Sequence, residues 1–354
     1  MDKILITGGC GFVGSSLAFA MKKKYGGAKI YCFDNLKRRG SELNVGRLQD
    51  FGIEFVHGDI RNPEDIESVG GFDLLLECSA EPSVLAGYNS SPTYLINTNL
   101  VGTLNCLESV RKHKANMVFL STSRVYPISP IENLNYYETE TRFELSDEQD
   151  VDGVSSKGLN EEFPINGIRS LYGATKLSSE LIIQEYAEMY NLKLLINRCG
   201  LLTGPWQFGK IDQGVIVFWV AKHFWKGSLS YIGYGGTGKQ VRDLLHVKDL
   251  NNLIEIQISN INKFSGNIYN VGGGKDVSLS LLELTELCVK YTGSSINIGR
   301  VKKTRVADIP VYLSDSSKVT DATGWKPKIF PNEIISEIVR WIKDNNLLLE
   351  RILK

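Results

Sequence analysis

The sequence predicts an α/β protein built on a doubly wound parallel sheet, followed by a smaller region of mixed α/β structure. Short apolar runs rich in β-branched residues alternate with helical patterns through the first half of the chain. Strands separated by helices form βαβ units and hence a parallel sheet covered on both faces. The runs are continuously apolar, which is typical of strands buried on both sides. The expected strands are residues 4–7, 30–33, 53–57, 74–78, 117–121 and 194–197.

The pattern changes near residue 200, where aromatic-rich and glycine-rich segments begin to mix with short strands and helices. We therefore expect a first domain of residues 1–199 and a smaller lobe of residues 200–354 that is interleaved with it. The polar, acidic stretch of residues 128–166 has few apolar anchors. It is expected to be a long insertion or lid in the first domain.

Composition limits the class of protein. The chain has 354 residues, 42% of them apolar and 23% charged, which is enough to bury a substantial core. Forty basic residues balance forty acidic ones, so the net charge favours neither nucleic acid nor an anionic membrane as a partner. A strand-like run at residues 3–7 without a charged leader, and the lack of an apolar span of membrane length, lead us to expect a cytoplasmic protein.

The cysteines are scattered through apolar runs and form none of the close pairs that metal sites or redox motifs need. We expect them to be reduced core residues, and we expect no metal site. They are Cys10, Cys32, Cys78, Cys106, Cys199 and Cys288.

A glycine-rich turn follows the first expected strand. Its glycines are spaced three apart, and a helical pattern covers residues 15–24. Glycine is needed where the chain turns tightly, where the backbone approaches a pyrophosphate, and where helix and sheet pack closely. The phosphates then face the positive end of the helix. A turn without a ligand has the same spacing, but the strand before it and the helix after it favour a Rossmann-type dinucleotide site. The residues of this site are Gly8, Gly11, Phe12, Val13 and Gly14.

An acidic residue, Asp34, ends the second expected strand. A carboxylate there accepts hydrogen bonds from both ribose hydroxyls and repels a 2′-phosphate, which favours NAD over NADP. The basic run of residues 37–39 leaves NADP open, because lysine and arginine are able to bind that phosphate. Asp59 and Ile60 end the third expected strand, where they either meet the adenine or form an ordinary turn.

Tyr172 and Lys176 are four residues apart at the start of a helical pattern, so both side chains lie on one face of the helix. A nearby ammonium favours the phenolate form of a tyrosine, which then removes a hydroxyl proton while hydride leaves the same carbon. This spacing is common in helices by chance. Together with the glycine turn and Asp34 it favours a catalytic pair. The hydroxyls of residues 121–123 end the preceding strand, where one of them either shares the substrate proton or only caps a turn.

With these residues in place, the chain resembles the extended short-chain dehydrogenase/reductase family, the NAD-dependent epimerases and dehydratases, over nearly its whole length. The general motifs are residues 7–14, Tyr172 with Lys176, and the Arg-Asp-x-x-His-Val-x-Asp motif of residues 242–249. Within the family the chain looks like the CDP-tyvelose (CDP-paratose) 2-epimerases. That resemblance rests on residues 34–36, 57–62, 138–142, 207–208, 212–214 and 238–243.

The resemblance implies a catalytic trio of Thr122, Tyr172 and Lys176. It also implies that the first domain binds NAD and that the second lobe binds a nucleotide-diphospho-sugar. In similar enzymes the resident NAD takes hydride from C2 of the sugar and returns it to the opposite face of a 2-keto intermediate. A homodimer or homotetramer is expected from the family. Further expected contacts of the cofactor are Asn35, Ser79, Ala80, Glu81 and Asn99.

Several positions depart from the patterns of related enzymes. In sugar-nucleotide 4,6-dehydratases the strand-end threonine is followed by Asp-Glu, which handle the elimination of water, whereas Ser123 and Arg124 follow Thr122 here. Many 4-epimerases and dehydratases carry an asparagine within the segment where this chain reads Arg-Cys-Gly-Leu at residues 198–201. These departures weigh against elimination and against a standard 4-epimerase pocket.

The substrate end is expected in the second lobe. Arg242 and Arg305 have spacings to acidic residues that resemble the diphosphate clamp of the family, and guanidinium binds phosphate oxygens in pairs. Surface salt bridges are the alternative. Phe208 is expected to flank the base or the sugar, or else to be a core residue. His246 is expected to organise the junction of the two lobes. The amide side chains expected to recognise the substrate are Gln207, Gln213 and Gln240.

Together with the residues above, the resemblance predicts an NAD-dependent nucleotide-sugar epimerase that inverts C2 of a CDP-hexose. Two alternatives stay open. The same trio serves a nucleotide-sugar 4-epimerase or reductase if C4 faces the nicotinamide, and a chain that lost catalysis would be an NAD-binding regulator. The base and the deoxygenation state of the sugar stay open as well.

Overall fold

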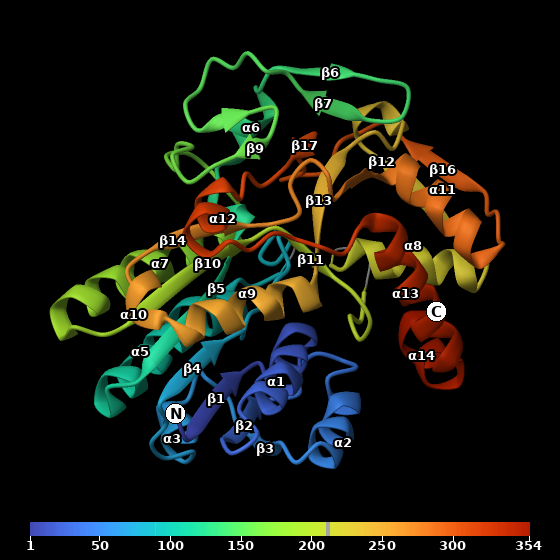
Figure 1. The fold of residues 1–354 in the computed structure, drawn as a ribbon. Helices are drawn as coiled ribbons and strands as arrows, with labels where there is room; N and C mark the ends of the chain where they lie inside the picture. Colours follow the sequence, from blue (N-terminus) through green and yellow to red (C-terminus); the bar gives the residue numbers. More distant parts are fainter. Residues whose placement is uncertain (89, 210–212) are drawn as a thin grey trace. The chain divides into compact units, whose positions relative to one another are not determined.

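The computed structural model describes residues 1–88, 90–209 and 213–354 (Figure 1). The chain divides into two compact units. Unit 1 comprises Met1–Val125, Ser170–Arg198 and Leu250–Tyr269, and unit 2 comprises Tyr126–Arg169, Cys199–Asp249 and Asn270–Lys354. The chain thus passes from one unit to the other several times. The expected functional division into residues 1–199 and 200–354 stays a prediction.

A parallel sheet forms the centre of unit 1. Among the described residues it has seven strands in the order β14-β10-β5-β4-β1-β2-β3. The order runs outward from β1 in two directions, so β1 and β4 flank the point where the winding reverses, and this is where doubly wound sheets bind ligands. The fold class predicted from the sequence is confirmed. The strands are β1 (Lys3–Thr7), β2 (Lys29–Asp34), β3 (Glu54–His57), β4 (Leu74–Glu77), β5 (Asn116–Thr122), β10 (Leu194–Cys199) and β14 (Ile268–Val271).

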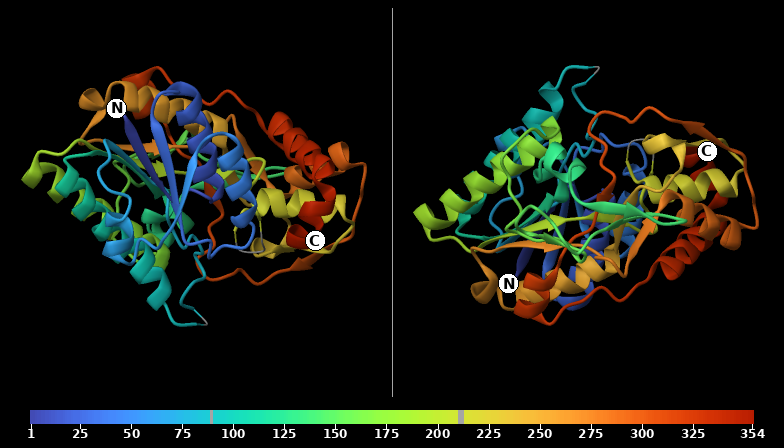
Figure 2. Two further views of the ribbon diagram at one scale, coloured as in Figure 1. Left: turned by 90° about the horizontal axis from the view of Figure 1, so that it is seen from below. Right: turned by 90° about the horizontal axis from the view of Figure 1, so that it is seen from above.

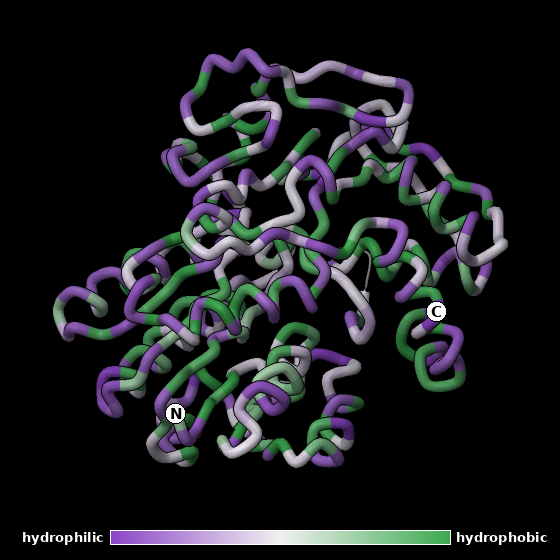
Figure 3. The backbone as a smooth tube through the Cα atoms, viewed as in Figure 1, coloured by the Kyte–Doolittle hydropathy of each residue, from purple (hydrophilic) through white to green (hydrophobic). Residues whose placement is uncertain are grey.

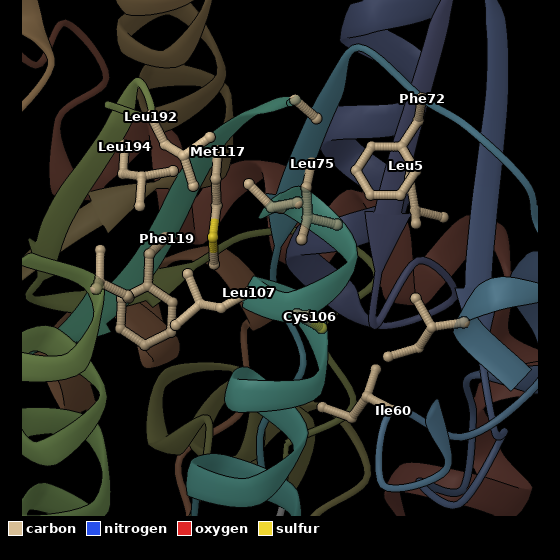
Figure 4. Packing of buried hydrophobic residues seen from close by; sticks show 14 of the residues in the cluster. Leu5, Ile60, Phe72, Leu75, Cys106, Leu107, Met117, Phe119, Leu192 and Leu194 are labelled. Carbon is tan, nitrogen blue, oxygen red and sulfur yellow. The ribbon is translucent and has the colours of Figure 1, made fainter. Parts of the chain in front are cut away.

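Both faces of this sheet are buried. Leu5, Leu75 and Met117 point to one face, where they pack in a hydrophobic cluster with Cys106 and Leu107 (Figure 4). Side chains alternate along a strand, so the flanking residues point to the opposite face. These flanking residues are fully buried as well, among them Ile4, Ile6, Leu74, Leu76 and Val118. Burial on both faces explains why the strands read as uninterrupted apolar runs.

Helices α5 and α7 lie side by side and cover the face that carries this cluster (Figures 1 and 2). Helix α7 (Leu171–Tyr190) begins at Ser170, whose hydroxyl accepts a hydrogen bond from the Gly173 N–H and so caps the helix. The other helical segments of the unit 1 ranges are α1 (Phe12–Lys24), α2 (Glu42–Asp50), α3 (Pro63–Glu67), α4 (Thr93–Ile96), the π-helical turn Asn97–Val101, α5 (Gly102–His113), the 3₁₀ turn Ser123–Val125 and α10 (Ile261–Phe264). Helix α9 (Val247–Ser259) begins in unit 2 and continues into unit 1.

Unit 2 contains a smaller mixed sheet whose central strand is β13 (Val241–His246). Strands β11 (Leu201–Thr203) and β17 (Val311–Tyr312) pair with β13 in parallel, and β15 (Ser278–Ser280) pairs with it in the antiparallel direction. Strands β12 (Leu229–Ile232) and β16 (Ile298–Val301) form a separate parallel pair. Three helices, α8 (Val215–Phe224), α11 (Leu281–Thr292) and α13 (Pro331–Asp344), pack against one another. Helices α12 (Ser317–Thr323) and α14 (Asn346–Leu353) and the 3₁₀ turn Tyr234–Gly236 complete the unit.

The stretch of residues 128–166 belongs to unit 2 and is better anchored than the sequence suggested. It holds helix α6 (Ile128–Glu132) and two short hairpins, β6 (Tyr136–Glu138) with β7 (Phe143–Leu145) and β8 (Val154–Ser155) with β9 (Gly158–Leu159). Most of it is hydrophilic or neutral (Figure 3). Widely spaced apolar side chains are nevertheless buried, namely Ile131, Leu134, Phe143, Leu145, Leu159 and Phe163. Because these residues are widely spaced, they form no continuous apolar run, and the sequence pattern did not indicate that they are buried.

The six cysteines are free thiols, and all but Cys78 are buried. Across the part of the chain that the structure describes, no helix is both long and apolar enough to cross a membrane. The same residues contain no cluster of histidine, cysteine and carboxylate side chains arranged to hold a metal ion.

Candidate active site

The glycine turn after β1 lies directly against the end of β4. Gly8 has a positive φ of 62°, and a Cβ added to it would lie 2.9 Å from the carbonyl oxygen of Cys78 and 3.0 Å from the Cα of Ser79. Only glycine therefore fits this position. The predicted cofactor residues Gly8 and Ser79, far apart in the sequence, are thus in contact where the sheet reverses its winding.

Helix α1 begins at this turn without a side-chain cap from the described part of the chain. Gly11 precedes the helix in an extended conformation, and no side chain of the described residues caps it. The Gly11 N–H donates to the Gly8 carbonyl at 2.9 Å, and the first helical turn, which includes Phe12, Val13 and Gly14, contains no acidic residue. Uncapped N–H groups at the positive end of a helix, above a cradle that a Cβ would fill, fit the pyrophosphate of a dinucleotide.

Asp34, the last residue of β2, is tied to the same turn. Its Oδ2 accepts a hydrogen bond from the Cys10 N–H at 3.0 Å, and its Oδ1 accepts one from the Leu36 N–H at 2.8 Å. Burial raises the pKa of Asp34, while these backbone hydrogen bonds oppose the rise. Each carboxylate oxygen has a second lone pair, so Asp34 can still accept hydrogen bonds from ribose hydroxyls.

Asp59 and Asn35 link the ends of β3 and β2. Asp59 Oδ2 accepts a hydrogen bond from the Asn35 amide at 2.8 Å and pairs with Arg61 at 2.6 Å. Burial tends to raise the pKa of Asp59, but the hydrogen bonds from Arg61 and Asn35 outweigh it and lower that pKa to about 2. Ile60 is buried, and an added Cβ at Gly102 would lie 2.5 Å from its Cδ1. Asp59 therefore connects the ends of β3 and β2. Its contact with the adenine stays a prediction.

The basic residues after β2 include Lys37, which the sequence left open for a 2′-phosphate. Its Nζ lies 5.2 Å from the centroid of the Tyr94 ring, and the Arg61 guanidinium lies 4.8 Å from the same centroid. Lys37 is therefore engaged in a cation–π contact.

The segment after β4 is held by Asn99 in the π-helical turn. The Glu81 N–H donates to Asn99 Oδ1 at 2.8 Å, and the Asn99 amide donates back to the Glu81 carbonyl at 3.1 Å. The same amide donates to Thr175 Oγ1 on α7 at 3.3 Å. Ala80 is half-buried within this segment. Ser79, Ala80 and Glu81 are consecutive, and Asn99 is hydrogen-bonded to Glu81. The structure thus brings these four predicted residues together.

The predicted catalytic residues lie where α7 packs against the end of β5. Thr122 is the last residue of β5, and its Oγ1 accepts a hydrogen bond from the Arg124 N–H at 3.2 Å. Tyr172 is half-buried in the first turn of α7, and Lys176 is buried one turn later. Lys176 Nζ lies 3.9 Å from the centroid of the Phe119 ring on β5. Tyrosine, lysine and threonine at one strand end are a suitable set for removing and returning a hydroxyl proton.

Two buried carboxylates near these residues were not singled out in the sequence. Glu77 at the end of β4 lies 3.8 Å from Lys176 Nζ. Glu180, one turn beyond Lys176, forms a two-point ion pair with Arg198 on β10 and accepts a hydrogen bond from the Ser121 hydroxyl. A glutamate inside an apolar strand, as in Leu-Leu-Leu-Glu at residues 74–77, is the signal that would have indicated Glu77, since a buried charge needs a partner.

In unit 2, the side chains of Gln207 and Phe208 are engaged locally. The Gln207 amide donates to the Leu202 carbonyl at 2.8 Å, and its Oε1 accepts from the Thr203 hydroxyl at 3.1 Å. Phe208 is buried against Trp341, with ring centroids 6.3 Å apart. These contacts close the turn after β11 and leave sugar recognition by Gln207 as a prediction.

The other predicted substrate residues also lie in unit 2. The Arg242 guanidinium donates to Asp308 Oδ1 at 2.8 Å and to the Ile309 carbonyl at 2.7 Å. Gln240 is buried and donates to the Ile232 carbonyl at 2.7 Å, and its Oε1 has no hydrogen-bond partner in the described part of the chain. Gln213 is buried, and Arg305 is half-buried three residues before Asp308. Asp212, part of the motif that carried the resemblance, lies outside the described residues.

His246 ends β13 and is fully buried. Its Nδ1 accepts a hydrogen bond from the Lys248 N–H at 3.1 Å, and its Nε2 lies 3.3 Å from Glu337 Oε2 on α13. The contact with His246, together with Lys248, lowers the pKa of Glu337 to about 2. His246 therefore joins β13 to α13 within unit 2, and its expected role at a junction of lobes stays a prediction.

Comparison with known proteins connects this geometry to a family. Residues 4–272 match the model of the NAD dependent epimerase/dehydratase family. The chain belongs to this family. NAD is therefore its cofactor, in keeping with the uncapped helix and the Asp34 carboxylate described above.

Individual members of the family resemble the chain over almost its full length. It is 34% identical to a CDP-paratose 2-epimerase of Salmonella typhi, covering 96% of this chain and 98% of that protein. It is 26% identical to a dTDP-glucose 4,6-dehydratase of Streptomyces niveus, covering 97% and 93%. Among solved structures, the dTDP-glucose 4,6-dehydratase of Bacillus anthracis in complex with NAD has a TM-score of 0.76 at 25% identity, covering 99% of this chain and 100% of that one.

Proposed function

We propose that the chain is an NAD-dependent nucleotide-sugar epimerase that inverts C2 of a CDP-hexose of the paratose/tyvelose type. The observation that carries this proposal is the end of β5. Thr122 is followed directly by the 3₁₀ turn Ser123–Val125, which presents Ser123 and Arg124 where dehydratases carry the acids that eliminate water. The similarity to a CDP-paratose 2-epimerase over nearly the whole chain supports the same choice.

The residues would act as follows. Bound NAD supplies the acceptor and later the donor of the hydride. Tyr172, as phenolate, takes the proton of the C2 hydroxyl as hydride leaves C2, and Thr122 hydrogen-bonds the reacting oxygen. The product of this half-reaction is a 2-keto sugar. After the sugar turns over, Tyr172 returns the proton as hydride reaches the opposite face, so one phenol serves both half-reactions and no net redox occurs.

The residues of unit 2 would hold the nucleotide. The Arg242 guanidinium, at the start of β13, is hydrogen-bonded to Asp308, and Arg305 lies three residues before Asp308 in the sequence. Two guanidinium groups of this kind suit a diphosphate, whose oxygens accept paired hydrogen bonds. Gln207, Gln213 and Gln240 would recognise sugar or base hydroxyl and amide groups.

Two helices of unit 1, α5 and α7, carry exposed apolar side chains. Leu104 on α5 and Leu181 and Met189 on α7 are exposed apolar side chains. They support association of two or more copies through these helices, as a homodimer or homotetramer. The cytoplasm is the proposed location.

The experiment is to incubate the protein, purified without added cofactor, with CDP-paratose and with CDP-, UDP- and GDP-hexoses in deuterated water, following each carbon by NMR. We expect inversion at C2, no incorporation of solvent deuterium and no net NADH. Inversion at C4, loss of water or stoichiometric NADH would overturn the 2-epimerase assignment. No turnover of any of these compounds would favour the non-catalytic alternative.

A further inference from the structure

A buried carboxylate faces the lysine of the proposed catalytic pair. The Glu77 side chain is 0% exposed, the Lys176 side chain is 2% exposed, and Glu77 Oε2 lies 3.8 Å from Lys176 Nζ. The same Nζ lies 3.9 Å from the centroid of the Phe119 ring. Both a carboxylate and the face of an aromatic ring stabilise a cation. The surroundings of Lys176 are therefore those of a buried ammonium ion.

The fold places Glu77 at the centre of the candidate site. In the sheet register Glu77 lies opposite Thr7 on β1 and opposite Phe119 on β5. Glu77 Oε1 accepts a hydrogen bond from the Ser79 N–H at 2.9 Å. Glu77 Oε2 has no hydrogen-bond partner among the described residues. One oxygen thus orders the segment after β4, and the other faces Lys176 across a distance at which attraction is mainly electrostatic.

We propose that Glu77 is a positioning residue that keeps Lys176 a buried ammonium ion and thereby sets the pH range in which Tyr172 exchanges its proton. The proposal rests on the proposed function, because it takes Tyr172 and Lys176 as the proton-transfer pair. An ammonium ion this deeply buried is unstable without a compensating charge. Glu77 supplies that charge from β4, which lies next to β5 in the sheet.

Two other ionisable side chains among the described residues, Glu180 and Cys106, lie near this pair. Glu180, one turn further along α7, is bound to Arg198 on β10. Burial raises the pKa of the Cys106 thiol on α5, which keeps it neutral. Burial also raises the pKa of Glu77, while the charge of Lys176 and the Ser79 hydrogen bond oppose that rise. Ser79 and Thr7 contribute only neutral groups.

Removing the charge of Glu77 has a definite electrostatic consequence. Without a negative neighbour, Lys176 loses its proton at lower pH. Tyr172 also forms phenolate at lower pH, because the remaining positive charge of Lys176 is no longer balanced. In Glu77→Gln both limbs of a bell-shaped pH–rate profile therefore move towards acid, by about one pH unit or more. A loss of structure alone would lower the height of the profile without moving its limbs.

The first test needs no sugar substrate. Lysine labelled with ¹³C at Cε is followed by NMR as a function of pH, and the Lys176 signal is identified by its loss in Lys176→Arg. We expect the wild-type ammonium to stay protonated through neutral pH, and its titration to move at least about one unit lower in Glu77→Gln. A wild-type Lys176 that titrates near neutral pH, or a titration that Glu77→Gln leaves in place, would overturn the proposal.

The second test is the pH profile of kcat/KM with the sugar nucleotide that the protein turns over. Glu77→Asp keeps the charge and is expected to keep both limbs near their wild-type positions, whereas Glu77→Gln shifts both. Glu185→Gln, which removes an exposed carboxylate from α7, is the matched control and should shift neither limb. Epimerisation with unshifted limbs in Glu77→Gln would refute the role of Glu77 and leave the proposed function standing. A shifted lysine titration in a protein that does not epimerise any sugar nucleotide would refute the proposed function and leave the effect of Glu77 on Lys176 standing.

Discussion

A Cβ added to Gly14 would lie 2.2 Å from the carbonyl oxygen of Gly8. The first turn of α1 is therefore packed against the backbone of the glycine turn, and neither partner is a flexible side chain. In Gly14→Ala the turn has to open, which moves the N–H groups that we expect to bind the pyrophosphate. We expect at least a tenfold loss of NAD affinity, about 1.4 kcal/mol, together with a lower unfolding temperature.

Calorimetric titration of the cofactor-free protein with NAD measures this effect. Gly27→Ala is the matched control, because a Cβ at Gly27 would meet no atom within 4 Å. Equal affinities of the two alanine variants would mean that the close contact between Gly14 and Gly8 has no bearing on the cofactor.

Tyr172→Phe removes one hydroxyl from the first turn of α7 and keeps the ring. Because the phenol is the proposed proton acceptor, we expect NAD binding to be kept and epimerisation to fall by about 10²- to 10⁴-fold. Tyr190→Phe on the same helix is the control, since Tyr190 is exposed and far from the strand end. Activity measured with bound NAD quantified in each sample separates the two variants, and an active Tyr172→Phe would exclude a role for the phenol in proton transfer.

Arg242→Lys keeps a positive charge and loses the paired donors of the guanidinium. Arg242 donates from Nη2 to Asp308 and Ile309 and from Nη1 to the Val241 carbonyl. A lysine has one nitrogen in place of this planar fork, and it binds phosphate at a single point. We expect KM for the nucleotide sugar to rise by about tenfold with kcat little changed, because uniform binding is lost. Arg340→Lys, at an exposed position on α13, should leave both constants near wild type. A fall in kcat with unchanged KM would place Arg242 outside the proposed clamp.

Asp59 makes part of the stability dependent on acid. Although burial opposes it, the hydrogen bonds from Arg61 and Asn35 lower the pKa of Asp59 to about 2 in the folded chain. A folded pKa below the unfolded value of about 3.9 stabilises the protein fully above about pH 4, and this stability is lost as the pH falls towards 2. In Asp59→Asn we expect lower stability at neutral pH and a smaller decline between pH 5 and 2.

Urea unfolding across that pH range measures the difference. Asp50→Asn, at an exposed position at the end of α2, is expected to follow the wild type. If the unfolding free energies of Asp59→Asn and the wild type differ by the same amount at every pH, the ion pair with Arg61 does not make the stability depend on pH.

The sequence was a good guide to features built from neighbouring residues. The spacing of Gly8, Gly11 and Gly14 between a strand and a helix is a local pattern, and the structure places the turn beside Asp34 and Ser79 as the fold class requires. Continuous apolar runs likewise predicted the buried strands, because burial on both faces removes polar alternation.

Features made by distant partners could not be predicted in this way. Glu77 and Lys176 lie on β4 and α7, which come together only in the folded chain. The residues around Glu77 do not indicate that Lys176 is its partner, and the residues around Lys176 do not indicate Glu77. The amide of Gln207 suggests sugar recognition, yet in the structure it is hydrogen-bonded to Thr203 and Leu202, within a few residues of its own position. An amide side chain has the same appearance in a sequence whether it closes a turn or recognises a sugar.

The buried pair of Glu180 and Arg198 gives the sharpest stability test of such distant partners. Their side chains are 1% and 5% exposed, and Glu180 also accepts a hydrogen bond from the Ser121 hydroxyl. Removing one member leaves an uncompensated charge in the core, so we expect Arg198→Met to cost about 3–5 kcal/mol of unfolding free energy. In the double variant Glu180→Leu with Arg198→Met no charge remains, and much of that loss should be recovered. Arg111→Met, which breaks an exposed pair with Glu108, should cost less than about 1 kcal/mol. Denaturant unfolding of the wild type, the single variants Arg198→Met, Glu180→Leu and Arg111→Met, and the double variant gives these differences. A double variant as unstable as the sum of its single changes would mean that the pair contributes packing and hydrogen bonds but no coupled charge.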